Sequence, residues 1–110
     1  MSALDIDEDR VGKAMRYLAE TDLAYAEAKA ALESAEILRK RVRARVFLTE
    51  DGTVAERQAE AETHHDTEAA DDQYVQAIKA FEELKARRQR AELVVALFRT
   101  LEASRRKGMQ

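Results

Sequence analysis

Proline is absent from this chain of 110 residues, and glycine occurs only three times. These are the residues that most often end helices and build turns, so the chain has few places to change direction. Alanine alone contributes 21 residues, and Lys, Arg, Glu, Gln and Leu, also strong helix formers, supply more than half of the rest. β-Sandwiches and barrels need many turn residues, and a disulfide or cysteine–zinc scaffold needs cysteine, which is absent. The sequence therefore predicts an all-α protein.

The clearest turn signal lies at Gly52. Glycine tolerates the left-handed backbone conformation that ends a helix, Thr53 is a good N-cap, and Glu56 follows three residues later to complete a capping box. The predicted elements are a helix over about residues 7–49, a turn over 50–53 and a helix over about 54–106. Because a short connection makes two helices antiparallel neighbours, we expect one domain over 1–110, an antiparallel hairpin of two long helices of coiled-coil type.

Two segments could interrupt these helices. Thr21 falls on a core position, and Thr21-Asp22 could cap a new helix. Residues 62–68 contain no large apolar side chain, so this segment is either a solvated helical turn or a break that Asp66 or Thr67 recaps.

The first predicted helix carries apolar residues at heptad spacing, and the second carries them at alternating spacings of three and four, which is typical of coiled coils. The first apolar stripe consists of Val11, Ala14, Leu18, Tyr25, Ala28, Leu32, Ala35, Val42 and Val46. The second apolar stripe consists of Tyr74, Ala77, Phe81, Leu84, Arg88, Ala91, Val95 and Phe98, widened by Ile78, Val94 and Leu101.

The second apolar stripe is wider than one thin partner helix needs, so we expect the chain to form a homo-oligomer. The predicted oligomer interface is Tyr74, Ile78, Phe81, Leu84, Arg88, Val95 and Phe98. Arg88 is the polar member of this set, and we expect it to fix the helix register by pairing with Glu20 or Asp22.

A net charge of −3 hides separate charge blocks. Residues 37–49 carry five basic and no acidic side chains, whereas residues 50–73 carry nine acidic and one basic. The basic block could track a phosphate backbone. Phe47 is either a ring that stacks on a base or an apolar cap on the tip of the hairpin. The candidate nucleic-acid-binding residues are Arg39, Lys40, Arg41, Arg43, Arg45 and Phe47.

The hairpin also offers an explanation of the basic block without a ligand. A turn at Gly52 places two residues opposite each other when their numbers add up to about 103. Arg45 then faces about Gln58, and Arg41 faces about Glu62. The basic block then lies beside the acidic one, and charge pairing within the chain competes with phosphate binding as its role.

Catalytic and metal-binding signals are weak. His64, His65, Asp66 and Glu68 form a cluster with metal-ligating side chains, but zinc needs three or four supported ligands, so we expect solvent-facing histidines and no metal. The sequence has no glycine-rich phosphate loop and no nucleophile elbow. We therefore expect no enzyme activity and no cofactor.

The order of a basic helix (Arg39 to Arg45), a glycine turn, an acidic stretch, an apolar stripe and an Arg-rich end resembles phage recombination mediators of the UvsY type over about residues 35–105. The resemblance implies a homo-oligomer that binds single-stranded DNA and helps to load a recombinase onto strands coated by single-strand-binding protein. Residues 39–45 would then line the DNA path. The net acidic charge departs from this pattern, because nucleic-acid binders are usually basic.

Two functions remain in competition. One is a single-stranded DNA-binding accessory protein of phage-type recombination. The other is a helical protein-interaction module, an adaptor or an inhibitor of a host protein, that binds no nucleic acid. The acidic N-terminus lacks the features of a signal peptide and no apolar run suits a membrane span, so we expect a cytoplasmic location without membrane contact.

Overall fold

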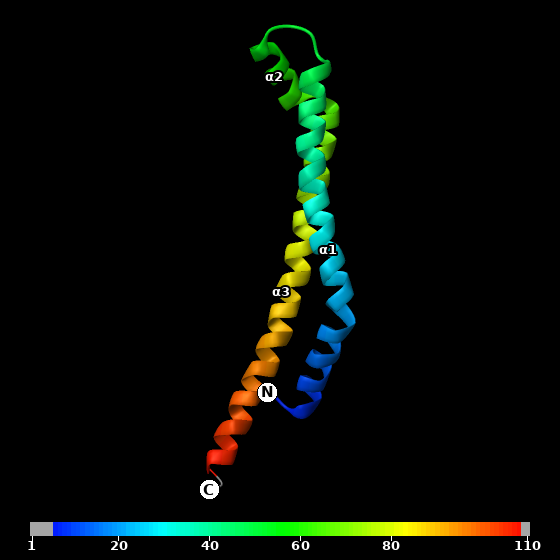
Figure 1. Ribbon diagram of the computed structural model, residues 1–110. Helices are drawn as coiled ribbons and strands as arrows, with labels where there is room; N and C mark the ends of the chain where they lie inside the picture. The colour runs from blue at the N-terminus through cyan, green and yellow to red at the C-terminus, as the bar shows by residue number, and fades with distance from the viewer. Residues whose placement is uncertain (1–5, 109–110) are drawn as a thin grey trace. The chain divides into compact units, whose positions relative to one another are not determined.

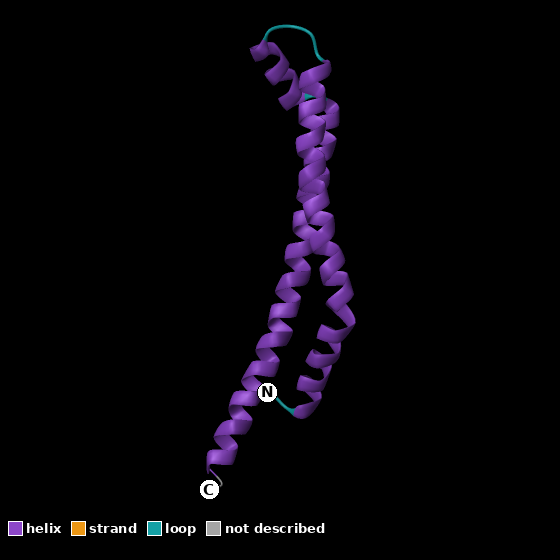
Figure 2. Cartoon of the chain, viewed as in Figure 1, coloured by secondary structure: helices purple, strands orange, loops and turns teal. Residues whose placement is uncertain are grey.

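The computed structural model describes residues 6–108, and this part of the chain is all-helical, as predicted. It contains α1 (Glu8–Thr49), α2 (Val54–Thr63) and α3 (His65–Gly108), with short loops between them (Figures 1 and 2). The second predicted helix is thus divided into α2 and α3, and the structure has three helices rather than two.

α1 begins where its acidic first turn predicts. The side chain of Asp7 accepts a hydrogen bond from the backbone N–H of Arg10 at 2.8 Å and caps the helix. The helix then continues through Thr21, so the alternative break at Thr21-Asp22 does not occur. The Thr21 hydroxyl donates to the carbonyl oxygen of Tyr17 at 2.7 Å, which satisfies this polar group inside the helix.

The turn after α1 follows the predicted chemistry. Gly52 has a φ of 116°, a conformation that residues with a Cβ rarely adopt. A Cβ at this position would also lie 2.6 Å from Oε2 of Glu56. The Thr53 hydroxyl accepts from the N–H of Glu56 at 3.2 Å and caps α2.

His64 separates α2 from α3, inside the segment in which a break was one of the two alternatives. Its backbone is extended, and its N–H donates to the carbonyl oxygen of Glu60 at the end of α2. Its Nδ1 accepts a hydrogen bond from the N–H of Asp66 at 3.0 Å and so caps α3. Histidine therefore fills the capping position that the sequence analysis assigned to Asp66 or Thr67, because an unprotonated ring nitrogen is an acceptor.

The chain divides into two compact units, which are described separately. Unit 1 comprises residues 1–25 and 83–110, and unit 2 comprises residues 26–82. Among the described residues, the buried apolar side chains are all valine or alanine. In unit 1 these are Val11, Ala14 and Ala91, and in unit 2 they are Ala35, Val42, Val46, Ala61 and Ala70. Val42, Val46, Ala61 and Ala70 form one cluster, against which Phe47 packs.

The register between α1 and α3 differs from the simple hairpin. In unit 2 Asp71 pairs with Arg39, and in unit 1 Arg88 pairs with Asp22, each seven residues from the position that a hairpin turning at Gly52 gives. The reason is that α2 folds back along α1 before α3 begins. The two helices are joined there by the ion pair between Arg43 and Glu62. A displacement of seven residues is two helical turns, so the same faces still meet.

Thr67 lies in unit 2, is fully buried, and its hydroxyl has no hydrogen-bond partner. A helical threonine usually donates to the carbonyl oxygen four residues earlier, but here the break at His64 separates Thr67 from that residue. We expect Thr67→Val to raise the free energy of unfolding by about 1 kcal/mol, because it removes an unpaired polar group without a change of shape. Urea denaturation measures the change. Thr100→Val, at an exposed threonine whose hydroxyl is bonded to Ala96, is the control and should not stabilise.

Candidate functional site

The basic block is partly neutralised inside unit 2. Nε of Arg39 lies 3.2 Å from Oδ1 of Asp71, and Nη2 of Arg43 lies 3.4 Å from Oδ2 of the same carboxylate. Nε of Arg43 is also 3.3 Å from Oε1 of Glu62, although it is not aligned for a hydrogen bond. The guanidinium of Arg39 lies over the ring of Tyr74 at 4.6 Å. Two of the five basic residues are thus held by acidic groups of α2 and α3.

The other three basic residues are exposed. Lys40 forms an ion pair with Glu36, one turn earlier on α1, at 3.4 Å. Arg41 and Arg45 form no ion pair or hydrogen bond through their side chains within residues 6–108. These two arginines are one helical turn apart and remain available to an anionic partner.

Phe47 is half-buried and already has a cation on its ring. The Arg57 guanidinium lies 4.3 Å from the ring centroid, and its Nε donates to the backbone carbonyl of Phe47 at 3.0 Å. A base could stack on this face only after displacing Arg57. The contact fixes α2 against the end of α1 in unit 2.

A groove of about 520 Å³ lies beside Phe47, between α1 and α2. No pattern in the sequence predicts this groove, because its walls come together only where α2 folds back along α1. Its apolar lining is Ala44, Phe47, Leu48 and Ala61, and its polar lining is Lys40, Arg43, Gln58 and Glu62.

The predicted oligomer interface is only partly covered within the chain. Tyr74, Ile78 and Phe81 in unit 2, and Leu84, Arg88, Val95 and Phe98 in unit 1, are all half-buried. The widening residue Leu101 is exposed. None of the six aromatic side chains of the protein is fully buried.

Arg88 is the most engaged side chain of this set. Its Nη1 donates to the carbonyl oxygen of Leu18 at 2.8 Å and to the Thr21 hydroxyl at 2.6 Å, and its Nη2 donates to Oδ1 of Asp22 at 2.7 Å. The guanidinium also lies 5.0 Å from the ring centroid of Tyr25. The predicted pairing of Arg88 with Glu20 or Asp22 is confirmed for Asp22.

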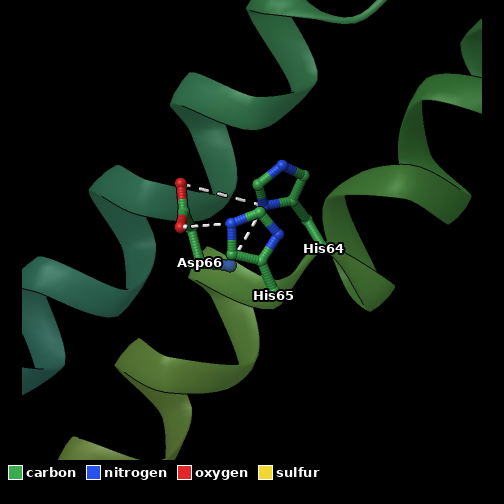
Figure 3. A group of neighbouring side chains, drawn as sticks. All are labelled: His64, His65 and Asp66. Carbon is green, nitrogen blue, oxygen red and sulfur yellow. Dashed lines mark hydrogen bonds and ion pairs between the residues drawn. The ribbon is translucent and has the colours of Figure 1, made fainter.

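The two histidines stand at the α2–α3 junction (Figure 3). Their rings stack at a centroid distance of 4.3 Å, and Nε2 of His65 lies 3.1 Å from Oδ1 of Asp66. His65 is exposed as predicted, whereas His64 is half-buried and its side chain is only 20 % exposed.

No protein-family model, curated protein or solved structure matches this chain. Within residues 6–108, no helix combines the length and the apolar character that crossing a bilayer requires.

Proposed function

We propose that this protein is a non-enzymatic helical interaction module that works as a homo-oligomer, with α1 and α3 paired as an antiparallel hairpin of coiled-coil type. The observation that carries this proposal is the incomplete burial of the second apolar stripe. Within residues 6–108 the buried apolar residues are valine and alanine, while every aromatic ring keeps part of its surface in water. A second helical surface, supplied by another copy of the chain, would cover the rest.

Each ring covered by such association contributes a modest energetic gain. An aromatic side chain has about 150–250 Å² of surface, and a half-buried ring exposes at most about a third of it, so covering that part contributes up to about 1.5 kcal/mol at 25 cal/mol per Å². Phe81 and Phe98 are half-buried on the same apolar stripe, and two copies of the chain would contribute both rings twice. The four rings together contribute up to about 6 kcal/mol, which meets the lower part of the entropic cost of association, and the other half-buried members of the stripe add to it.

The chain offers a direct test at two positions of α3. Phe98→Glu places a charge on the half-buried stripe, whereas Leu93→Glu places the same charge on a residue that is 58 % exposed. The two positions are about 140° apart around the helix. We expect Phe98→Glu to convert the oligomer into monomers in sedimentation velocity, and Leu93→Glu to leave it intact. Circular dichroism must show that both variants keep their helix content. If Phe98→Glu loses helix content, Phe98→Ala takes its place in the test. A folded Phe98 variant that associates as the unmodified chain does would contradict the proposal.

Single-stranded DNA binding of the UvsY type is the second candidate, and one observation favours it. Arg41 and Arg45 are exposed and unpaired among the described residues, so they are able to contact phosphates. Against it stand the internal pairing of Arg39 and Arg43 and the coverage of Phe47 by Arg57.

Fluorescence anisotropy of a labelled single strand, at low and physiological salt, decides between the two functions. The interaction module predicts no binding at physiological salt. The mediator function predicts tight, salt-sensitive binding that Arg41→Ala/Arg45→Ala weakens strongly. Arg39→Ala/Arg43→Ala is the matched control, because it removes the same charge from arginines already held by Asp71 and Glu62.

A further inference from the structure

Three side chains with metal-ligating atoms meet at the end of unit 2 where the helices change direction. They are Glu50, just after α1, Glu60 on α2, and His64 at the α2–α3 junction. One ligand atom from each lies within 4.8 Å of the other two. We propose that these residues form a binding site for a divalent transition-metal ion, with zinc as the reference case, that ties the three segments together.

The electrostatics of this place favour a cation. Glu50 and Glu60 bring two negative charges close together, and neither has an ion pair to a lysine or arginine within residues 6–108. α1 and α2 both end nearby, and neither has a basic residue in its last turn. Helix C-termini carry partial negative charge, so two carboxylates there repel these helix ends as well as each other. The positive end of α3 offsets part of this repulsion, but Asp66 and Glu68 in its first turn already complement it. Arg57 does not relieve this repulsion by an ion pair, because it is engaged with the carbonyl and ring of Phe47.

The donor set suits a borderline metal ion. One imidazole nitrogen and two carboxylate oxygens are ligands that zinc accepts in sites with three protein ligands and an open fourth position. Calcium and magnesium prefer oxygen ligands alone, so the histidine selects against them.

His64 can serve as a ligand through its second ring nitrogen. Its Nδ1 faces Asp66, and its other ring nitrogen, Nε2, points away (Figure 3). Binding of a metal at Nε2 requires the ring proton to sit on Nδ1, so Nδ1 exchanges the N–H of Asp66 that it accepts for a proton to donate. Oδ2 of Asp66 lies 3.8 Å from Nδ1 and comes into hydrogen-bond distance by a small movement of that side chain. A carboxylate behind a ligating imidazole is the arrangement that orients histidines at many metal sites. The proton moves from Nε2 to Nδ1 of the same ring, so the imidazole stays neutral and no proton is gained or lost.

His64, His65 and Asp66 form a second group with ligand atoms within 4.8 Å, but this group is the weaker candidate. Its members are consecutive in sequence. The ring nitrogen of His64 on the side of Asp66, Nδ1, already accepts the N–H of Asp66. His65, with a side chain 84 % exposed, brings no second structural element to the site. A variant of His65 therefore distinguishes the two groups.

The test is calorimetric titration of the full chain with zinc, and with cobalt for its visible absorption on binding nitrogen and oxygen ligands. We expect one ion per chain and a rise in melting temperature with added zinc. Glu60→Gln and His64→Asn should weaken binding by roughly 100-fold or more, since the loss of a supporting residue alone costs 10–100-fold. Asparagine is chosen at position 64 because it is itself a good N-cap and should keep α3 intact.

His65→Asn is the matched control and should bind zinc as the unmodified chain does. Absence of saturable binding to the unmodified chain would overturn the proposal. Loss of binding in His65→Asn, with binding retained in Glu60→Gln, would overturn it in favour of the exposed histidine pair.

Discussion

Replacing Arg88 with alanine is expected to lower the free energy of unfolding by about 3 kcal/mol. The side chain is only 13 % exposed and donates to Leu18, Thr21 and Asp22. The ion pair with Asp22 contributes little to this loss, because the Asp22 side chain is 70 % exposed and well solvated. The main terms are the hydrogen bonds to Leu18 and Thr21 and the space left by the arginine stem, which packs inside unit 1.

Urea denaturation followed by circular dichroism measures this effect. Arg87→Ala is the matched control, because Arg87 is exposed and its removal should change stability by less than about 0.5 kcal/mol. Arg88→Met separates the two main terms, since methionine keeps an apolar stem and lacks the donors. Equal stabilities for the two alanine variants would show that Arg88 does not hold α3 against α1.

Val46→Asp is expected to lower the free energy of unfolding by about 4 kcal/mol or more. Val46 is 4 % exposed and belongs to the cluster that joins α1, α2 and α3 in unit 2. The substitution loses apolar burial and places a carboxylate among Val42, Ala61 and Ala70, whose apolar side chains offer it no hydrogen bond.

Leu48→Asp is the control for Val46→Asp, measured in the same denaturation experiment. Leucine is the larger apolar residue, but Leu48 is 72 % exposed and lies two positions further along the same helix. If burial decides the cost, Leu48→Asp destabilises the chain by much less than Val46→Asp. The reverse order would mean that the cluster around Val46 does not support unit 2.

Much of the fold follows from local sequence signals. Every member of the first apolar stripe, from Val11 to Val46, is buried or half-buried, because heptad spacing places these residues on one side of α1. The turn at Gly52 and the cap at Thr53 also follow from the residue types themselves. These features depend on short-range geometry, which the sequence carries directly.

The register of α3 could not be predicted in the same way. It depends on whether residues 62–68 continue the helix, and the energies of a solvated turn and a break are similar when no large apolar residue is present. The break lies at His64, and the histidine ring caps α3. Histidine is a poor predictor of a helix start, since its ring caps a helix only in one protonation state and orientation.

The partners of charged side chains depend on that same register. The sequence places Arg41 opposite Glu62, whereas the structure pairs Arg43 with Glu62 and Arg39 with Asp71. Likewise, Glu50 and His64 are far apart along the chain, and only the fold-back of α2 brings them together. Charge blocks therefore indicate which regions attract each other, but not which side chains remain free for a partner.

The mass of the unmodified chain in solution tests the central claim most directly. Sedimentation equilibrium over a wide range of protein concentration, at physiological salt and without nucleic acid, gives this mass relative to the 12.5 kDa of one chain. Association through the second apolar stripe predicts a discrete multiple of this mass that persists at high salt, because apolar burial is not screened. A chain that stays monomeric at every concentration would contradict the account.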